Sequence, residues 1–377
     1  MYLKDIIRGE MRMEIRNLVC KTLRDKPETR RASRRLGNID FSKLIHMGLN
    51  ENVFGMSPKA VEIMNATTES GNYYQDWTQR ELKAAIAEHY GVTPDYIVTG
   101  CGSSSLTEAL GTAFLEPGDE IVLCMPTFPA IIDTAQMNGA SAVIVQMGED
   151  LIYDMDALLA AITDKTKLVY ICNPNNPTGT YVSKDRLMEF ASKCPDHVIQ
   201  VYDEAYIEFA EAPDCLEMTE AMKTMPEKPI VLLKTFSKFY GMAGIRAGYI
   251  LAQPEIIEWL SKCGTQFALS KVSQAGAAAA MKDLEHQKYV KEENTKWRGY
   301  LMDGLAELGC KVYPSQTNFI FFHPHVDPET VSMKMMERGI MISAQAGANR
   351  VSVGKPEHCE LFLKYMKEII EEMKAEG

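Results

Sequence analysis

A lysine among hydroxyl-bearing and small residues is the first feature of this sequence that could carry out chemistry. It lies in Thr235-Phe-Ser-Lys-Phe-Tyr-Gly-Met-Ala-Gly-Ile-Arg-Ala-Gly-Tyr249. A lysine that condenses with an aldehyde needs a neutral amine held in place, and a phosphate on the same ligand needs hydroxyls and a guanidinium nearby. Lys238 could form the Schiff base, and Thr235, Ser237 and Arg246 could hold the phosphate. The stretch therefore predicts a covalent lysine beside a phosphate site.

A carboxylate and a phenol follow a second apolar run, in Val201-Tyr-Asp-Glu-Ala-Tyr-Ile-Glu-Phe209. We expect Asp203 at the end of a buried parallel strand, and the carboxyl ends of such strands face the crevice where α/β sheets hold ligands. Asp203 could pair with a protonated pyridine nitrogen, which keeps the ring positive and electron-withdrawing. Tyr206 could form a hydrogen bond to a phenolic oxygen on the same ring.

A rigid turn, Asn173-Pro-Asn-Asn-Pro-Thr-Gly179, follows the apolar run Leu168-Val-Tyr-Ile-Cys172. Its two prolines fix φ, and Gly179 permits a tight exit. The turn therefore predicts that an amide such as Asn176 is presented rigidly to a ligand at the end of a strand.

The order of these motifs resembles that of the class I/II aminotransferases, fold-type-I enzymes dependent on pyridoxal 5′-phosphate. The pattern is Asn-Pro-Thr-Gly, then Asp-x-x-Tyr, then Ser-Lys-x-x-Gly-x-x-Gly-x-Arg, and the resemblance covers nearly the whole chain. In detail the chain is most similar to histidinol-phosphate aminotransferases, through Leu49-Asn-Glu-Asn52, Asp203-Glu-Ala-Tyr-Ile-Glu-Phe209 and Arg350-Val-Ser-Val-Gly354. The resemblance implies an α/β fold, with a large domain whose mostly parallel, seven-stranded sheet is covered by helices and a smaller α+β domain.

The resemblance also implies further contacts with the cofactor. Gly102, Ser103 and Ser104 match the family's phosphate cradle at the start of a helix. Small residues let backbone N–H groups approach an anion there, and the helix dipole favours its charge. Phe128 matches the aromatic residue that stacks on the cofactor ring.

Two more residues would complete the site. Tyr74 matches a tyrosine that reaches the phosphate of the neighbouring subunit, although Tyr73 could take its place, so a homodimer with shared active sites is expected. Arg350 matches the arginine that binds the α-carboxylate of the substrate in the family. A planar guanidinium suits this role because it can donate two hydrogen bonds to one carboxylate. Asn176 is expected beside it as a second substrate contact.

The reaction implied by the resemblance is a two-stage transamination. An amino acid displaces Lys238 from the cofactor, and the freed amine moves a proton from Cα to the cofactor. A 2-oxo acid, expected to be 2-oxoglutarate, then reverses these steps. Lys238 would be a covalent anchor and then a general acid/base, which suits an amine whose pKa is lowered by its site.

Each residue taken alone has a plainer interpretation. An isolated lysine is usually solvated, Asp203 could cap a helix, Phe128 could pack in a core and Arg350 could be a solvated charge. Order and spacing favour the functional interpretation, because chance would have to place five family motifs in sequence in one chain. For Tyr74, simple packing remains a competing interpretation.

The amino donor is the point at which this chain departs from the family pattern. Histidinol-phosphate aminotransferases typically carry a phosphate-binding arginine in a Gly-Ile-x-x-Arg segment, whereas this chain has Gly339-Ile-Met-Ile-Ser343. A phosphorylated donor would lose a charge-assisted contact of about 1.5–3 kcal/mol, which an N-terminal arginine could restore. A donor without phosphate, such as an aromatic L-amino acid, therefore weighs at least equally with histidinol phosphate.

Two other functional classes remain open from the sequence. The same scaffold can run a lyase, decarboxylase or oxidase reaction, because the cofactor performs the hard chemistry. A noncatalytic regulator would need an appended DNA-binding domain, and the roughly 50 residues before the large domain show no helix-turn-helix pattern. Lys238 together with Asp203 favours an enzyme.

Composition limits the remaining possibilities. With 377 residues and 46% hydrophobic content we expect two domains, a large cofactor domain (53–285) and a small C-terminal domain (286–377). The resemblance implies that the N-terminal segment (1–52) is also part of the small domain. The net charge of −11 argues against general nucleic-acid binding, and no apolar run is long enough to span a bilayer. The nine cysteines lack metal-ligand spacing, and Cys124 and Cys172 lie in apolar runs, so we expect no metal site and a reducing cytoplasm. Cys101 could be reactive, although core packing is the preferred interpretation.

The first 35 residues are rich in lysine and arginine and include Thr29-Arg-Arg-Ala-Ser-Arg-Arg35. The twin arginines are followed by Leu36-Gly-Asn-Ile-Asp40 and not by an apolar core, so an export signal is rejected. A basic helix on a partner subunit is the favoured use of this segment, and a solvated face is the alternative.

Alternating periodicities place these motifs on a wound sheet. Helices are expected at 81–89, 157–162 and 360–374, and a long helical stretch is expected after residue 280, running to about Leu308. Strands are expected at 120–124, 168–172, 230–234 and 318–322. Because the strand at 230–234 runs straight into the lysine loop, it should position Lys238.

Overall fold

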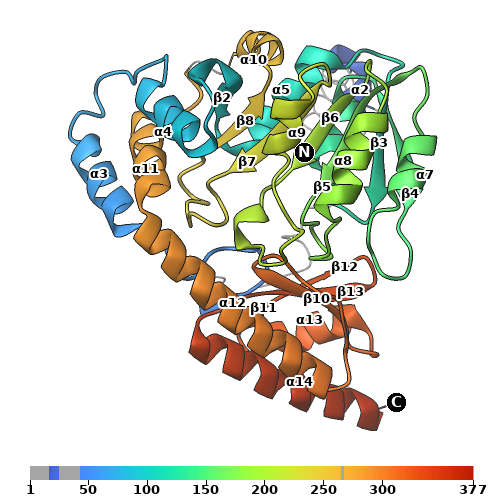
Figure 1. Cartoon of the computed structure of the whole chain (residues 1–377). Coiled ribbons are helices and arrows are strands. Elements are labelled where there is room, and N and C mark those ends of the chain that lie inside the picture. Colours follow the sequence, from blue (N-terminus) through green and yellow to red (C-terminus); the bar gives the residue numbers. More distant parts are fainter. Residues whose placement is uncertain (1–16, 25–42, 265–266, 377) are drawn as a thin grey trace, which may run out of the picture.

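Seven strands form the central sheet of the larger part of the molecule (Figure 1). The computed structural model describes residues 17–24, 43–264 and 267–376. The strands lie in the order β2 (Ile97–Gly100), β8 (Gly248–Ala252), β7 (Ile230–Thr235), β6 (Ile199–Asp203), β5 (Thr166–Cys172), β3 (Glu120–Met125) and β4 (Ser141–Gln146). The neighbours from β7 to β4 pair in parallel, and β8 runs antiparallel to both β7 and β2.

Helices cover both faces of this sheet because its strands are apolar on both sides. Along β5, Val169 and Ile171 enter one core, while Leu168, Tyr170 and Cys172 enter the other. The first core is closed by α3 (Pro58–Thr68), α4 (Arg80–Tyr90), α7 (Met155–Ala160), α8 (Lys184–Lys193), α9 (Thr219–Thr224) and α11 (Lys271–Lys282). The second is closed by α5 (Gly102–Phe114), α6 (Ala130–Met137) and α10 (Pro254–Ser261). The predicted fold class is confirmed.

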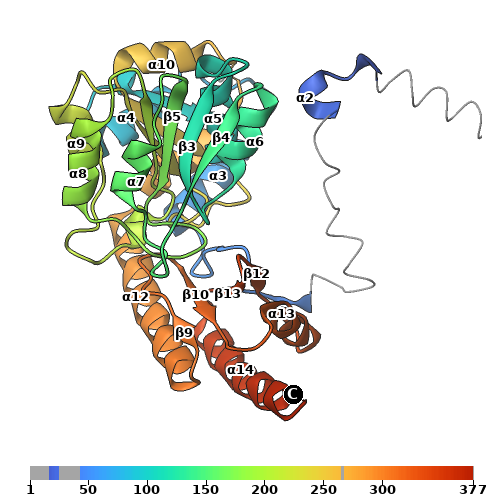
Figure 2. The same cartoon turned by 90° about the vertical axis from the view of Figure 1, so that its right-hand side faces the viewer.

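A smaller antiparallel sheet lies below the first, as Figure 2 shows from the side. Its strands are in the order β12 (Ser343–Gln345), β13 (Ala348–Ser352), β10 (Phe319–His323) and β9 (Lys311–Val312). The short β1 (Ile45–His46) pairs in parallel with β11 (Ile340–Met341). Around them lie α12 (Leu284–Glu307), α13 (Pro328–Glu337) and α14 (Pro356–Glu376).

The helix α12 links the two parts. It contributes Val290 to the first core of the large sheet, and Trp297, Leu301 and Leu305 to the core of the small one. Met47, from the segment before the large sheet, packs in that same small core. The domain boundaries at residues 52 and 285 stay predictions, since α12 crosses the second of them without a break.

The expected strands and helices are present. The long helix expected after residue 280 is α12, and it is separated from α11 at Asp283, whose φ of −89° and ψ of 72° are not helical. The Asp283 carboxylate accepts hydrogen bonds from Ser57 (2.6 Å) and Lys59 (2.8 Å). These partners are distant in the sequence, so helical periodicity does not reveal what holds Asp283 at this break.

The basic N-terminal segment lies mostly outside the described residues. Only the short helix α2 (Lys21–Arg24) and its immediate neighbours are described there, so its place on a partner subunit stays a prediction. Across residues 17–24, 43–264 and 267–376, no helix has the length and apolar character needed to cross a bilayer.

A fully buried lysine connects the strands that end at the predicted site. Lys234, on β7, lies 2.9 Å from Glu204 Oε2 and 2.7 Å from Glu217 Oε1. Burial alone would lower the pKa of Lys234, but these carboxylates hold it well above the usual value. Nearby Glu208 has a buried oxygen, Oε2, that finds no hydrogen-bond partner in the described part of the chain, and burial raises the pKa of Glu208 to about 7. Breaking such a pair leaves an uncompensated buried charge, so the network fixes β6 against β7.

Glu208→Gln is expected to stabilise the protein at pH 8 and to change its stability little at pH 4.5. The folded state keeps the Glu208 proton up to about pH 7, while the unfolded chain loses it near the usual pKa of 4.5. The contribution of Glu208 to the free energy of unfolding of the wild-type protein therefore falls by about 3 kcal/mol as the pH rises from about 4.5 to 7. Above pH 7 this contribution no longer changes. Urea unfolding at both pH values measures this, with exposed Glu371→Gln as the control. Equal effects at the two pH values would contradict the account.

Candidate active site

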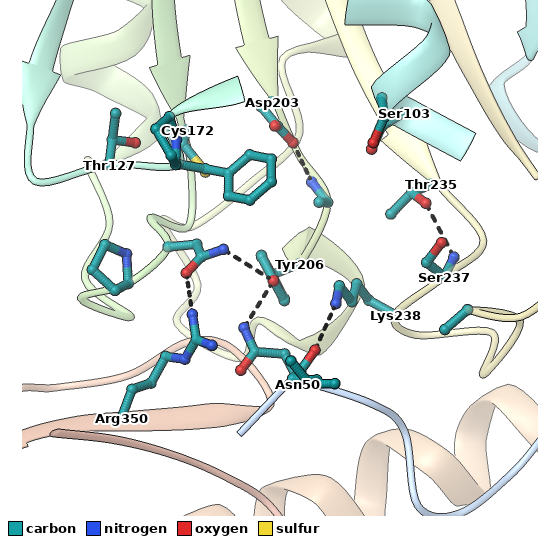
Figure 3. A pocket seen from close by; sticks show the side chains of 18 of the residues that line it. Asn50, Ser103, Thr127, Cys172, Asp203, Tyr206, Thr235, Ser237, Lys238 and Arg350 are labelled. Carbon is teal, nitrogen blue, oxygen red and sulfur yellow. Dashed lines mark hydrogen bonds between the residues drawn. The ribbon is translucent and has the colours of Figure 1, made fainter. Parts of the chain in front are cut away.

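A pocket of about 470 Å³ lies between the carboxyl ends of the large sheet's strands and the small sheet (Figure 3). Eleven of the thirteen residues predicted for the site line it: Ser103, Ser104, Phe128, Asn176, Asp203, Tyr206, Thr235, Ser237, Lys238, Arg246 and Arg350. Gly102, which precedes Ser103 at the start of α5, and Tyr74 are not among the lining residues. The structure thus brings together motifs that are spread over some 250 residues of sequence.

The start of α5 and the loop after β7 form an anion cradle. Gly102, at the first turn of α5, has a φ of +79°, and a Cβ there would collide with the guanidinium of Arg246. The helix cap, Cys101, is half-buried and makes no side-chain capping bond, so it leaves the N–H groups of the first turn to another acceptor. Arg246 Nη1 donates to Ser237 Oγ (3.3 Å), and the Ser237 N–H donates to Thr235 Oγ1 (3.1 Å). Guanidinium, hydroxyls and a helix start are the donors that a phosphate needs.

Lys238 stands in the centre of the pocket, on the loop that leaves β7. Its Nζ donates to the carbonyl of Leu49 (3.1 Å) and lies 5.8 Å from the centre of the Tyr206 ring. Burial first, and then the positive charge of Arg350, lower the pKa of Lys238 to about 8. A larger fraction of this amine is therefore neutral near pH 7 than of a solvated lysine, which is what nucleophilic attack on an aldehyde requires.

Asp203 ends β6 and is buried, with 5% of the residue exposed. Oδ2 accepts a hydrogen bond from Tyr170 (2.5 Å), and Oδ1 accepts one from the Ala205 N–H (3.1 Å). Burial raises the pKa of Asp203, while Tyr170, Ala205 and the charge of Lys238 act in the opposite direction. A cation held against this carboxylate would favour its ionised form further.

Two amides fix the Tyr206 hydroxyl. Asn50 Nδ2 donates to it at 2.9 Å and Asn176 Nδ2 at 3.4 Å, while its ring packs edge-on against Phe319. Asn50 has a φ of +56° and is 1% exposed. Asn50 was not predicted as a site residue, because its contact with Tyr206 spans 156 residues. Its one signal in the sequence is the motif Leu49-Asn-Glu-Asn52.

Arg350 enters the pocket from β13 of the small sheet. Nη1 donates to Asn176 Oδ1 (2.6 Å) and Nη2 to the Gly48 carbonyl (2.7 Å), whereas Nε is buried without a partner among the described residues. Ser343 is the cross-strand partner of Arg350, and its hydroxyl donates to the same Gly48 carbonyl. The position at which the family pattern has an arginine thus lies beside Arg350.

Phe128 is 41% exposed and lines the pocket, so it is not the core residue of the plainer interpretation. The preceding Thr127 is buried, and it donates to Asn175 Oδ1 (2.7 Å) and accepts from the Tyr153 hydroxyl (2.8 Å). This network ties the segment that carries Phe128 to the rigid turn after β5. The ring is therefore available to stack on a flat ligand.

Tyr74 does not join this pocket within the chain. It is 83% exposed and packs edge-on against Phe267, with ring centres 5.8 Å apart. Tyr73 is 70% exposed. The roles predicted for either tyrosine require a second copy of the chain and stay predictions.

The pocket fits pyridoxal 5′-phosphate group by group. The cradle at Gly102 and Arg246 fits the phosphate, a lysine with a lowered pKa faces the pocket, and a buried carboxylate lies at the end of β6. When bound, this cofactor supplies an aldehyde for the lysine and an electron-withdrawing ring. The groups it would need are present, although the individual contacts stay predictions.

Comparison with known proteins agrees with this geometry. Residues 42–365 match the family model described as aminotransferase class I and II. The chain is 34% identical over 347 residues to histidinol-phosphate aminotransferase 2 of Carboxydothermus hydrogenoformans, which covers 90% of this chain and 93% of that protein. It is 36% identical over 315 residues to an aromatic amino acid aminotransferase of Corynebacterium glutamicum, covering 84% and 90% respectively.

A solved structure has the same fold as this chain. The histidinol-phosphate aminotransferase of Sinorhizobium meliloti, in complex with pyridoxal 5′-phosphate, superposes with a TM-score of 0.86 at 27% identity. The match covers 94% of this chain and 98% of that one.

Proposed function

Because the chain belongs to the class I and II aminotransferases, we propose that it moves the amino group of an aromatic L-amino acid to 2-oxoglutarate. It is a transaminase, and its cofactor is pyridoxal 5′-phosphate. The choice of donor and acceptor is our proposal. It is supported by Arg350, which lines the pocket, and by the pairing of Ser343 with Arg350 on the neighbouring strand.

Lys238 would bind the cofactor's aldehyde and would later move the proton at Cα of the substrate. With a pKa of about 8, about one amine in ten is neutral at pH 7, compared with about one in 3,000 at an ordinary lysine pKa. Its hydrogen bond to the Leu49 carbonyl is a single contact that the amine can exchange when it moves. The same nitrogen thus serves as nucleophile and as general base and acid.

Asp203 would hold a proton on the pyridine nitrogen, because its buried carboxylate lies at the end of β6 and still has lone pairs free. Tyr206, whose hydroxyl accepts from Asn50 and Asn176, would donate to the phenolic oxygen of the ring. Arg350 binds the substrate's carboxylate, and this would engage the unpartnered Nε. Each of these assignments stays a prediction for the named residue.

The observation that carries the donor assignment is that a serine and not an arginine pairs with Arg350 across β12 and β13. Among the described residues that line the pocket, the cations are Lys238, Arg246 and Arg350. The first binds the aldehyde and the second the cofactor's phosphate, so Arg350 alone faces the substrate's anionic group. One guanidinium compensates the charge of a carboxylate, whereas a doubly charged phosphate would need a second cation for the same compensation.

Labelled donors test this proposal directly. With ¹⁵N-phenylalanine and 2-oxoglutarate, the label is expected in glutamate, and kcat/KM for phenylalanine should exceed that for histidinol phosphate by at least about tenfold. Label in ammonia would contradict amino transfer, and a preference for histidinol phosphate would contradict the donor assignment.

Ser343→Arg is expected to raise kcat/KM for histidinol phosphate by about ten- to hundredfold without raising it for phenylalanine. The new guanidinium would stand opposite Arg350, where a phosphate could lie between the two. Ser343→Gln supplies a long polar side chain without charge and is the matched control. An equal gain with glutamine would show that length and not charge is responsible.

We also propose that two chains form a homodimer with shared active sites. Tyr74 and Phe267 pack together on the surface, and Tyr73 and Trp77 nearby in the sequence are 70% and 59% exposed. Exposed aromatic side chains gathered in this way are typical of interfaces. Sedimentation as a single chain at micromolar concentration would contradict the dimer.

A cytoplasmic location is our further proposal. All nine cysteines are free thiols, and six of them are buried, which suits a reducing compartment. Recovery of the protein in a secreted or periplasmic fraction would contradict it.

A further inference from the structure

The geometry of the large sheet places a buried tyrosine, Tyr170, directly behind the carboxylate of Asp203. Strands β5 and β6 pair in parallel, with Tyr170 opposite Val201 and Cys172 opposite Asp203. Because alternate residues of a strand point to the same face, Tyr170, Cys172 and Asp203 share one face of the sheet. Tyr170 therefore lies on the neighbouring strand two residues before the partner of Asp203. A long side chain can span this diagonal distance.

The contact between Tyr170 and Asp203 is short and buried. The Tyr170 hydroxyl donates to Asp203 Oδ2 at 2.5 Å, and the two residues are 1% and 5% exposed. The other oxygen, Oδ1, accepts from the Ala205 N–H at 3.1 Å. An ionised carboxylate only accepts hydrogen bonds, so the single phenolic proton is donated to the charged form. Both oxygens are thus fixed by the protein while each keeps a lone pair for a ligand.

Tyr170 does not line the pocket, so it acts on a bound molecule through Asp203 alone. Its neighbour Cys172 does line the pocket. A change at Tyr170 should therefore alter the electronic state of the ligand without removing a direct contact to it. This separates Tyr170 from residues such as Tyr206 and Arg350.

We propose that Tyr170 is a positioning residue that keeps Asp203 ionised against a protonated pyridine ring. The inference rests on the proposed role of Asp203 as the partner of the cofactor's ring nitrogen. The proton between the two groups can lie on nitrogen, which gives a charged pair, or on the carboxyl, which gives a neutral pair. A donor hydrogen bond to Oδ2 stabilises the charged pair, because hydrogen bonds to an ionised acceptor are stronger than those to a neutral one.

Loss of this hydrogen bond should move the proton toward Asp203 and make the ring a weaker electron sink. The expected cost to Cα proton transfer is about ten- to hundredfold in rate, the range of one charge-assisted hydrogen bond. KM for the amino donor should change by less than about threefold, since Arg350 and the phosphate cradle are untouched.

The test compares Tyr170→Phe with Tyr202→Phe, both in the cofactor-loaded protein. Tyr202 is a matched control because it is fully buried on β6, next to Asp203, but on the opposite face, where its hydroxyl donates to Gln200 at 2.9 Å. With the cofactor labelled with ¹⁵N at the ring nitrogen, the Tyr170→Phe protein should show a chemical shift moved toward that of neutral pyridine. The Tyr202→Phe protein should keep the wild-type shift and rate.

A second variant keeps the packing of the side chain intact. Incorporation of 3,5-difluorotyrosine at position 170 strengthens the phenol as a donor, so the ¹⁵N shift should move the opposite way, toward the fully protonated ring. If neither change at position 170 alters the shift relative to wild type, the inference is wrong. If the wild-type protein instead holds a protonated ring but does not transfer amino groups, the proposed function is contradicted and the role of Tyr170 stands.

Discussion

Replacement of Lys238 by alanine is expected to lower the rate of amino transfer by about 10⁴-fold or more, as removal of a catalytic nucleophile does in other enzymes. The pocket holds no second amine that could take over the chemistry among its described lining residues, since Arg246 and Arg350 are guanidinium groups that stay protonated. The variant loses both the covalent anchor and the group that moves the proton at Cα. These two losses affect the same nitrogen, so their costs are not separable by one substitution.

Cofactor binding should survive this substitution in part. Thr235, Ser237 and Arg246 still offer a phosphate site, and Asp203 still faces the ring position. Absorbance of the dialysed protein measures retained cofactor, and stopped-flow mixing with phenylalanine measures the residual rate. Lys262→Ala, which removes a lysine stacked on exposed Trp259, is the control and should behave as wild type. Turnover within tenfold of wild type in Lys238→Ala would rule out the assignment.

Asp203→Asn is expected to reduce the rate of the first half-reaction by about 10²–10³-fold, the range found when a buried electrostatic partner of a reacting group is removed. Asparagine has nearly the same shape, and its single carbonyl oxygen can keep one of the two hydrogen bonds, from Tyr170 or from the Ala205 N–H, while its NH2 group can accept neither. It also loses the negative charge that holds a proton on the ring nitrogen. The effect should therefore appear in kcat far more than in KM for the donor.

A cofactor analogue with a methylated ring nitrogen separates charge from structure in this variant. Its nitrogen is positive without a proton, so it should recover part of the lost rate in Asp203→Asn. It should give no such gain in the wild-type protein. Asp156→Asn, at an exposed ion pair with Arg186, is the control for removing a carboxylate. An unchanged half-reaction rate in Asp203→Asn would contradict the role given to this carboxylate.

The residues that stand at strand ends could be predicted from the sequence. Asp203 and Lys238 each follow an apolar run, and the carboxyl ends of parallel strands meet at one edge of the sheet. That rule brings Asn176, Asp203 and Lys238 together without any knowledge of strand order. The alternation of helical and strand patterns predicted a sheet covered by helices, and the resemblance to the class I/II aminotransferases implied the full fold class, which is confirmed.

Contacts that depend on register or on an unusual backbone could not be predicted. The hydrogen bond of Tyr170 requires knowing that Cys172 pairs with Asp203. That of Asn50 requires a positive φ and a chain that returns from the other end of the molecule. Lys234 was expected only as a residue of an apolar strand, and its two carboxylate partners come from elements that the sequence did not place beside it.

The departure at Ser343 shows the opposite case. The sequence showed a serine where the histidinol-phosphate enzymes typically have arginine, and the structure adds that it pairs with Arg350. The sequence could identify the change but not its neighbour. The antiparallel register of β12 and β13 places the serine beside Arg350, and this position is what relates the change to the choice of amino donor.

The central claim is that Lys238 and its pocket hold an amino group on the cofactor between two separate half-reactions. The most direct measurement is the absorbance of the cofactor-loaded protein on mixing with phenylalanine alone, without an acceptor. We expect the aldehyde-derived band to be replaced stoichiometrically by that of the aminated cofactor, and 2-oxoglutarate to restore the first band. If the band persists or recovers without acceptor while phenylalanine disappears, with ammonia or carbon dioxide released, the protein does not work as a transaminase on this donor and the account is contradicted.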